Sequence, residues 1–258
     1  MTGPSPKPVP RTALVTGASA GLGTEFARQL AAEGHSLVLV ARDRARLEDV
    51  AGRLEREYGT TAEVLPADLT DDAGLAAVVE RLTDPARPVE ILVNNAGIGL
   101  LGGFEENTAE DERNLLRLHC EAAMVLAHAA LQGMLARGSG RVVNVSSVAA
   151  FTPGGTYSAA KAWLLSFSRS ANVAYRRRGV KVTAVCPGLT HTEFHQRMGM
   201  DKSVAPGWMW LDAERVVREG LADNARGKAV SIPSMRYKVL VSGARLLPDS
   251  VVARAARR

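Results

Sequence analysis

A tyrosine and a lysine four positions apart, Tyr157 and Lys161, are the residues of this chain whose types and spacing best suit proton transfer. Residues at this spacing share one face of a helix. An ammonium near a phenol stabilises the phenolate and lowers the phenol pKa from its usual value of about 10. The pair therefore predicts a tyrosine that exchanges a proton near neutral pH, although an arbitrary pair at this spacing is more often a surface contact.

A glycine-rich segment near the N-terminus predicts a phosphate-binding turn. Gly17, Gly21 and Gly23 follow a β-branched run at 12–15 and precede a helical stretch at 24–33. Glycines let the backbone approach a pyrophosphate, whose charge is met by free N–H groups and by the helix dipole. The spacing Gly-x-x-x-Gly-x-Gly departs from Gly-x-Gly-x-x-Gly, and such a turn can also merely connect two elements. Its position between a strand and a helix favours dinucleotide binding.

The residues after the second expected strand bear on the choice between NAD and NADP. This strand, 37–40, is followed by Ala41, Arg42 and Asp43. A carboxylate here would bind the ribose hydroxyl of NAD, whereas an arginine would bind the 2′-phosphate of NADP. Because Ala41 fills the place of the carboxylate and the Arg42 guanidinium can bind phosphate, the sequence favours NADP. The alternative is that Arg42 is a solvated charge, and Asp43 suits the N-cap of a helix at 44–57 in either case.

Short β-branched runs alternate with longer amphipathic stretches, and this alternation must position the residues above. Strands are expected at 12–15, 37–40, 62–65, 91–93, 142–145, 180–185 and, weakly, 229–232. Strands and helices alternating at this spacing predict βαβ units, and continuous apolar strands suit a parallel sheet buried on both faces. The expected fold is α/β, a doubly wound and mostly parallel seven-stranded sheet with helices on both faces. No linker or repeat divides residues 11–258, so they are expected to form one domain.

Composition and charge exclude several other classes of protein. The 258 residues are 46% hydrophobic and 23% charged, which argues against disorder, collagen and coiled coil. The formal charge of +5 comes from basic residues that are scattered and often lie beside acidic ones, so no nucleic-acid partner is expected. No run of 18 uncharged apolar residues occurs, so no transmembrane segment is expected.

The cysteines and the N-terminus bear on metal binding and location. Cys120 and Cys186 are the only cysteines, each in an apolar stretch and without metal-ligand spacing, so no metal site is expected. Reduced structural cysteines indicate a cytoplasmic protein. Residues 1–10 contain four prolines and no apolar core, which predicts a disordered arm rather than a signal peptide.

Four further segments form a specific set with the glycine turn. They are Asn94-Asn95-Ala96-Gly97 after the fourth strand, Ser146-Ser147 after the fifth, Tyr157 to Lys161 opening a helix, and residues 186–192 after the sixth strand. In this order and spacing, the chain resembles the short-chain dehydrogenase/reductase family in its single-domain form, over residues 11–192. The resemblance implies a Rossmann domain that binds NAD(P).

The resemblance also assigns roles. It makes Tyr157 the general acid or base, Lys161 the residue that tunes Tyr157 and binds the nicotinamide ribose, and Ser147, in preference to Ser146, the hydrogen-bond donor to the substrate oxygen. Asn94 is expected to tie strands together, and Asp68 has the alternative of capping a helix near 71. The cofactor is expected to contact the turn and the strand ends through Gly17, Ser19, Gly21, Leu22, Gly23, Arg42, Asp68, Leu69, Asn95, Ala96, Gly97, Tyr157, Lys161, Pro187, Gly188 and Thr192.

Two departures from the family pattern stand out. His119 occupies the place where the family commonly carries an asparagine that takes part in a water relay with the lysine. If the backbone carbonyl binds the water, His119 preserves the relay; a helix histidine is more often merely packed. The stretch between Ser147 and Tyr157 is shorter than usual and contains Pro153, which reshapes the substrate entrance and weakens the assignment of Ser147.

The residues from about 190 onwards contain fewer candidates for catalysis or cofactor binding. The resemblance implies a substrate lid at about 190–225, and its large apolar residues suit an apolar substrate or, equally, an extra packed helix. They are Phe194, Met198, Met200, Trp208, Met209 and Trp210. The basic, partly apolar end at 236–258 allows weak contact with a membrane surface, but a docked helix with a frayed tip is the favoured interpretation.

The sequence therefore predicts an NADP-dependent oxidoreductase that transfers a hydride between NADPH and a hydrophobic ketone or secondary alcohol, such as a 3-oxoacyl, steroid or lipid-like molecule. The resemblance implies a homodimer or homotetramer. The alternative is a catalytically weak NAD(P)-binding sensor or scaffold of the same fold.

Overall fold

A parallel sheet organises the chain. The computed structural model describes residues 11–193, 205–244 and 246–256. Its seven strands lie in the order β3-β2-β1-β4-β5-β6-β7, and all pairings between them are parallel. The strands are β1 (Thr12–Thr16), β2 (Ser36–Ala41), β3 (Ala62–Pro66), β4 (Val89–Asn94), β5 (Gly140–Val145), β6 (Val180–Val185) and β7 (Val230–Ser231). The predicted doubly wound sheet is confirmed, and the strand order reverses between β1 and β4, where such sheets bind ligands.

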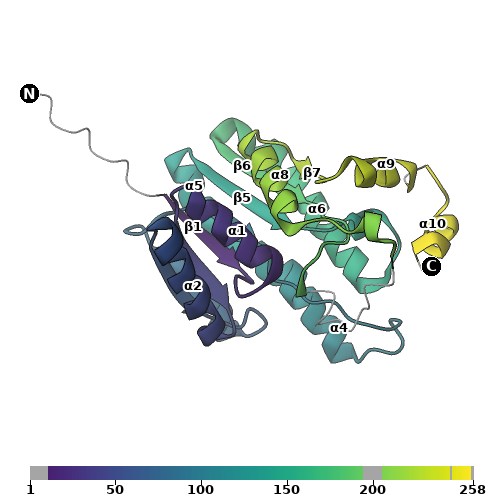
Figure 1. The fold of residues 1–258 in the computed structure, drawn as a ribbon, viewed down its shortest axis with the longest axis horizontal. Coiled ribbons are helices and arrows are strands. Elements are labelled where there is room, and N and C mark those ends of the chain that lie inside the picture. The colour runs from purple at the N-terminus through teal and green to yellow at the C-terminus, as the bar shows by residue number, and fades with distance from the viewer. Residues whose placement is uncertain (1–10, 194–204, 245, 257–258) are drawn as a thin grey trace, which may run out of the picture.

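Helices cover both faces of the sheet (Figure 1). One face carries α1 (Gly21–Ala32), α2 (Arg44–Tyr58) and α8 (Ala213–Ala225). The other carries α3 (Asp72–Thr83), α5 (Ala123–Arg137) and α6 (Gly155–Tyr175). The strand side chains Leu14, Val38 and Leu92 are fully buried, as expected for a sheet covered on both faces.

Helix starts follow the expected capping chemistry in part. The Asp43 carboxylate accepts a hydrogen bond from the Arg46 backbone N–H and caps α2, as predicted. Asp71, rather than Asp68, caps α3. Helix α1 begins at Gly21, three residues before its predicted start, so the glycine turn forms its first turn.

A π-helix interrupts the helix that crosses from β4 to β5. This η1 segment (Arg117–Ala122) lies between α4 (Ala109–Leu116) and α5 without a break in the helical backbone. Single π-helical turns inside α-helices frequently mark functional sites. Here the segment contains His119, one of the two departures from the family pattern.

The segment predicted as a lid is not uniform. Its last part forms α8, which buries Val216, Val217 and Leu221 against the sheet and so belongs to the body of the fold. Residues 194–204, with Phe194, Met198 and Met200, lie outside the described residues, as does the expected arm at 1–10. The lid therefore stays a prediction only for residues before α8.

Two short helices, α9 (Met235–Ala244) and α10 (Asp249–Ala256), follow β7. Tyr237 and Val241 of α9 are buried, which confirms a docked helix in this region. Within the described ranges, no helix is both long and apolar enough to cross a bilayer.

Candidate active site

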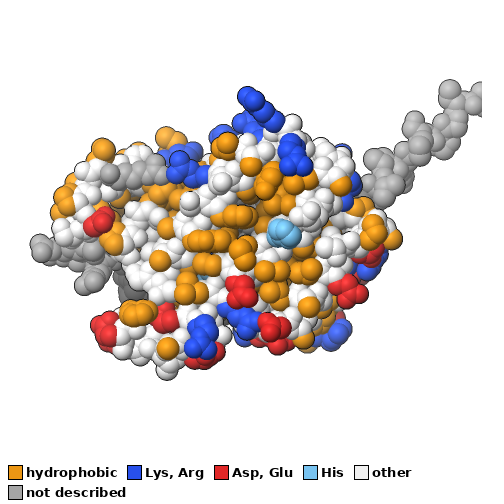
Figure 2. Space-filling model, turned by 180° about the vertical axis from the view of Figure 1, so that it is seen from behind, with side chains coloured by type: hydrophobic (Ala, Val, Ile, Leu, Met, Phe, Trp, Pro, Cys, Tyr) orange, Lys and Arg blue, Asp and Glu red, His pale blue; other side chains and the backbone are white. Residues whose placement is uncertain are grey.

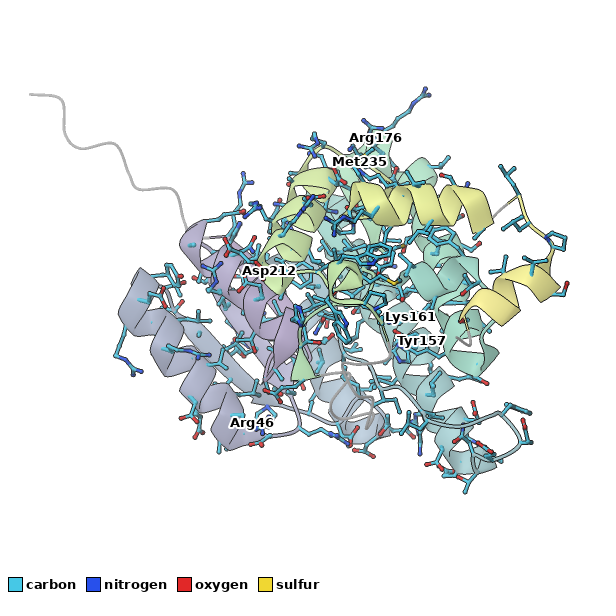
Figure 3. All side chains as sticks on the ribbon, turned by 45° about the vertical axis from the view of Figure 1, so that its right-hand side comes forward. Arg46, Tyr157, Lys161, Arg176, Asp212 and Met235 are labelled. Atoms are coloured by element: carbon cyan, nitrogen blue, oxygen red, sulfur yellow. The ribbon has the colours of Figure 1, made fainter. Side chains whose placement is uncertain are left out.

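Ser147, Tyr157 and Lys161 come together at the carboxyl end of β5. Ser147 follows β5 and starts a short 3-10 helix, η2 (Val148–Phe151), and Tyr157 and Lys161 lie in the first two turns of α6. The Ser147 side chain hydrogen-bonds the Tyr157 hydroxyl. Figure 3 shows Tyr157 and Lys161 next to each other. Three residues chosen from two separate motifs therefore share one site, at the strand edge where ligands bind in this fold.

Lys161 is held by the strand that precedes the serines. Its ammonium donates to the Val145 carbonyl at 2.7 Å and lies 5.6 Å from the centre of the Tyr157 ring. Burial lowers the pKa of Lys161 to about 8, and the Cys186 and Cys120 thiols oppose this shift. Ser146 supports the same helix, since its hydroxyl donates to the Lys161 carbonyl at 2.8 Å.

Tyr157 differs from the prediction in its resting protonation. Burial raises the pKa of Tyr157 to about 12, and the hydrogen bond from Ser147 only partly offsets that increase. The predicted lowering by Lys161 is wrong for this state, because the Lys161 ammonium is bonded to Val145 instead of the phenol. The phenol therefore keeps its proton at neutral pH and is poised to act as an acid.

His119 lies directly beside Tyr157. The two rings meet edge to face at 5.5 Å, and His119 Nε2 lies 2.7 Å from the Ile98 carbonyl oxygen and 3.1 Å from the Ile98 nitrogen. Burial and the Lys161 charge lower the pKa of His119 to about 3, so the imidazole is neutral. The histidine thus packs against Tyr157 and contacts the loop after β4 through Ile98.

A cavity of about 10 Å³ lies behind Lys161, with room for about one water molecule. His119, Asn94 and Thr16 also line it. His119 Nδ1 and Asn94 Oδ1 are buried without a hydrogen-bond partner among the described residues. Asn94 also ties β4 to β5 and α5 by donating to Asn144 and to the Ala123 carbonyl, as predicted.

The glycine turn is fastened to the loop after β4. The Thr16 hydroxyl accepts from the backbone N–H groups of Asn95 and Ala96, both at 3.0 Å, and the Asn95 amide donates to the Thr16 carbonyl. A side chain at Gly23 would collide with the Gly17 carbonyl at 2.0 Å, so this tight turn requires glycine there. Sequence reasoning did not single out Thr16; its only signal was its place at the end of β1.

The turn also meets the loop after β6. A Cβ on Gly21 would lie 3.2 Å from Thr192, so these two predicted residues are neighbours. An open groove of about 610 Å³ runs beside them. Its lining includes Ser19 as well as Arg46 and Arg53 of α2, which sequence reasoning missed.

The predicted adenosine end is only partly assembled. The Arg42 side chain is 75% exposed and lies 3.8 Å from the Asp68 carboxylate. Asp68 also accepts from the backbone N–H and the hydroxyl of Thr70. Burial raises the pKa of Asp68, but these hydrogen bonds and the charges of Arg42 and Arg117 together lower it below its usual value. The Leu69 side chain is buried in the core beside the small cavity, and its contact with the adenine stays a prediction.

Tyr237 of α9, which sequence reasoning did not single out, holds the loop after β6. The Tyr237 hydroxyl accepts from the Leu189 backbone N–H at 3.1 Å and donates to the Met209 carbonyl at 2.9 Å. A Cβ on Gly188 would overlap the Tyr237 ring at 2.1 Å. Pro187 contacts the residue after Ser147, because the Pro187 carbonyl accepts a hydrogen bond from the Val148 backbone N–H.

These residues fit a nicotinamide dinucleotide. The glycine turn offers close backbone approach at the start of α1, where a pyrophosphate is stabilised by the helix dipole. Position 97 has room only for glycine, because a Cβ there would lie 2.4 Å from His119 Cε1. The predicted contacts Gly17, Gly21, Gly23, Asn95, Ala96 and Thr192 therefore lie along one continuous edge of the sheet.

Comparison with a family model and with known proteins agrees with this site. The family model described as short chain dehydrogenase matches residues 11–203. Ketoacyl reductase HetN of Nostoc sp. is 35% identical over 183 residues, which make up 69% of this chain and 63% of the Nostoc protein.

Two solved structures are similar over nearly the whole chain. A short-chain dehydrogenase from Sphingobium yanoikuyae in complex with NADPH is 40% identical with a TM-score of 0.84, covering 92% of this chain and 94% of that one. The bulky-bulky ketone specific alcohol dehydrogenase from Comamonas testosteroni is 34% identical with a TM-score of 0.80, covering 93% of each chain. With its sheet order, glycine turn and Ser147-Tyr157-Lys161 cluster, the chain belongs to the short-chain dehydrogenase/reductase family of oxidoreductases.

Proposed function

We propose that this protein is an NADPH-dependent reductase of hydrophobic ketones. The observation that carries the proposal is the hydrogen bond between Ser147 and Tyr157, with Lys161 one helical turn away. When bound, NADPH supplies the hydride. Ser147 hydrogen-bonds the substrate oxygen, Tyr157 donates the proton from its phenol, and Lys161 supports Tyr157 and binds the cofactor ribose.

Reduction is the favoured direction at the resting site. A pKa of about 12 keeps the Tyr157 phenol protonated at neutral pH, so it is ready to donate a proton to a carbonyl oxygen but not to accept one from an alcohol. Alcohol oxidation would first require loss of this proton. The oxidation rate is therefore expected to rise with pH more steeply than the reduction rate.

Aromatic side chains beside the site support a hydrophobic substrate. Trp208 and Trp210 follow the loop after β6, and Trp210 stacks on His191 with ring centres 5.1 Å apart. The similar Comamonas enzyme acts on bulky-bulky ketones, and the Nostoc relative is named as a ketoacyl reductase. Ketones with two large apolar substituents, including 3-oxoacyl, steroid and lipid-like ones, are therefore the substrates to test first.

Replacing Tyr157 with phenylalanine tests the chemistry. The Tyr157→Phe variant is expected to lose about a hundredfold or more in kcat with NADPH on any ketone that the wild type reduces, because the proton donor is gone. Tyr175→Phe, at the other end of the same helix, is the matched control and should keep its activity. Substantial turnover by Tyr157→Phe would overturn the mechanism, and NADPH binding without turnover on a ketone panel would favour the sensor or scaffold alternative.

Arg42 supports the preference for NADP. Its exposed guanidinium stands just after β2, beside Asp68, and the similar Sphingobium structure contains NADPH. Arg42→Leu is expected to raise the KM for NADPH by about tenfold and to leave the KM for NADH within about twofold, because only NADPH carries the 2′-phosphate. Arg44→Leu, an equally solvated arginine paired with Glu48, is the control. Equal increases in the KM for NADPH and the KM for NADH would show that Arg42 does not recognise the 2′-phosphate.

We also propose a homo-oligomer that assembles through α5 and α6. Figure 2 shows hydrophobic side chains gathered on the face opposite α1, α2 and α8. Met124 of α5 and Trp163 and Val173 of α6 are exposed, and Trp163 stacks on Phe167 with ring centres 5.4 Å apart. A cytoplasmic location suits the two free cysteines, Cys120 and Cys186.

A further inference from the structure

The positive charge of the protein is concentrated at its C-terminal end. Residues 235–258 hold six of the 32 basic residues and one of the 27 acidic residues, so this segment alone carries a formal charge of +5. The other 234 residues carry 26 charges of each sign and are neutral overall. The net charge of the chain is thus a property of the last tenth of its length rather than of the enzyme body.

The same segment exposes large apolar side chains. On α9, Met235 and Val239 are 66% and 67% exposed and Leu240 is also exposed, while Tyr237 and Val241 face the body. Beyond it, Leu246 is 86% exposed, and Leu247 and Val251 are about half exposed. Figure 1 shows α10 at the edge of the molecule, beyond α9. Two consecutive helices therefore show their apolar residues to solvent.

An aromatic residue extends this surface towards the active site. Trp208 is 54% exposed, and the Arg236 guanidinium donates to its carbonyl at 2.6 Å, which connects the residues just before α8 to the start of α9. Tryptophan is enriched where proteins meet the interface of a bilayer. We call the exposed side chains of Trp208, Met235, Val239, Leu240, Leu246, Leu247 and Val251 the C-terminal apolar surface.

We propose that the C-terminal apolar surface docks on a membrane that contains anionic phospholipid. Basic residues attract the negative headgroups, and the exposed apolar side chains enter the interface beneath them. A symmetric contact with a second copy would bring two segments of +5 together, which is unfavourable. Nucleic acid would match the charge but would leave the exposed leucines in water. Of these three partners, an anionic bilayer satisfies both features.

Docking there would place the substrate entrance at the bilayer. Tyr237 connects α9 to the loop after β6 through Leu189 and to Met209, so the surface and the nicotinamide end of the site belong to one packed unit. A hydrophobic ketone dissolved in lipid would then reach the site without crossing water. The membrane docking goes beyond the proposed reductase activity and does not depend on it, whereas this delivery of a ketone rests on that activity.

Vesicle flotation with the full chain tests the proposal. The protein is expected to float with vesicles of phosphatidylcholine mixed with phosphatidylglycerol, to stay behind with phosphatidylcholine alone, and to be released by high salt. Leu246→Ser with Leu247→Ser should weaken binding by about tenfold or more. Leu101→Ser with Phe104→Ser, two exposed apolar residues elsewhere, is the matched control and should bind like the wild type.

A charge variant and an activity assay separate the possible outcomes. Lys238→Glu with Arg254→Glu lowers the segment charge from +5 to about +1 and should abolish the preference for anionic vesicles. All these variants should keep the wild-type rate on a water-soluble ketone, which distinguishes failure to dock from failure of the enzyme. Vesicle binding that is the same with and without anionic lipid, or the same for the leucine variant and the wild type, would overturn the proposal. The proposal would also fail if the variants changed only the oligomeric state or only the retention on nucleic acid.

Discussion

Burial sets the protonation of the three titratable side chains at the centre of the site. Tyr157, Lys161 and His119 have pKa values of about 12, 8 and 3, and in each case the largest cause is desolvation, which disfavours the charged form. The spacing of Tyr157 and Lys161 predicted that they would be neighbours but not that Lys161 would bond the Val145 carbonyl. Which partner the buried ammonium takes depends on the path of the preceding strand, β5, and the spacing of Tyr157 and Lys161 does not specify that path.

His119 is expected to make the protein sensitive to acid. Its pKa is lowered to about 3 in the fold, so between pH 6.5 and pH 3 the unfolded chain binds a proton that the folded chain does not. This contribution is complete above pH 6.5 and is lost as the pH falls. The free energy of unfolding should drop by roughly 2 kcal/mol from this residue between pH 7 and pH 5.

Urea unfolding at the two pH values measures this effect. His119→Gln should show a smaller drop than the wild type, whereas His128→Gln, an exposed histidine on α5, should match the wild type. Equal drops in the free energy of unfolding for all three proteins would mean that the fold does not lower the pKa of His119.

At the level of elements, the π-helix and the loop after β4 form one unit. The η1 segment turns His119 towards Gly97 and Ile98, and His119 in turn packs on Tyr157. The strands and most helices were predictable, because apolar periodicity and caps such as Asp43 are local signals. The π-helix was not, since nothing in the residue pattern of this segment distinguishes a π-turn from an α-turn.

Gly97→Ala tests the contact between this loop and the π-helix. An added Cβ would lie 2.4 Å from His119 Cε1, so the substitution should destabilise the fold by about 1–3 kcal/mol and lower kcat. Adding His119→Ala should restore much of the stability, because it removes the clashing ring. Gly207→Ala, which has open space around its Cβ position, is the control for the loss of a glycine. Additive effects in the double variant would show that the two residues do not touch.

For the whole molecule, a neutral body carries two distinct apolar surfaces. One lies on α5 and α6 and the other at the C-terminal end. We assign the first, where Met124, Trp163 and Val173 are exposed, to a second copy of the chain, and the second, whose segment carries a formal charge of +5, to a membrane. The sequence predicted the one sheet but could not assign these surfaces, since exposure depends on how helices pack.

Charges placed on the α5 and α6 surface should dissociate the oligomer. Met124→Glu with Trp163→Glu puts like charges on both copies of a symmetric contact, and light scattering after gel filtration should show a smaller species than the wild type. Leu101→Glu, a comparably exposed residue outside these helices, should leave the mass unchanged. An unchanged mass for the double variant would place the contact elsewhere.

The hydrogen bond from Leu189 to Tyr237 makes one amide proton a reporter. The Leu189 N–H is held by a hydroxyl from α9, so it exchanges with solvent deuterium only when α9 lifts from the loop after β6. Its exchange rate therefore measures how often α9 detaches from the loop after β6. Cofactor or vesicles that clamp this helix would slow that exchange, and the change can be followed at a single backbone position without any assay of turnover.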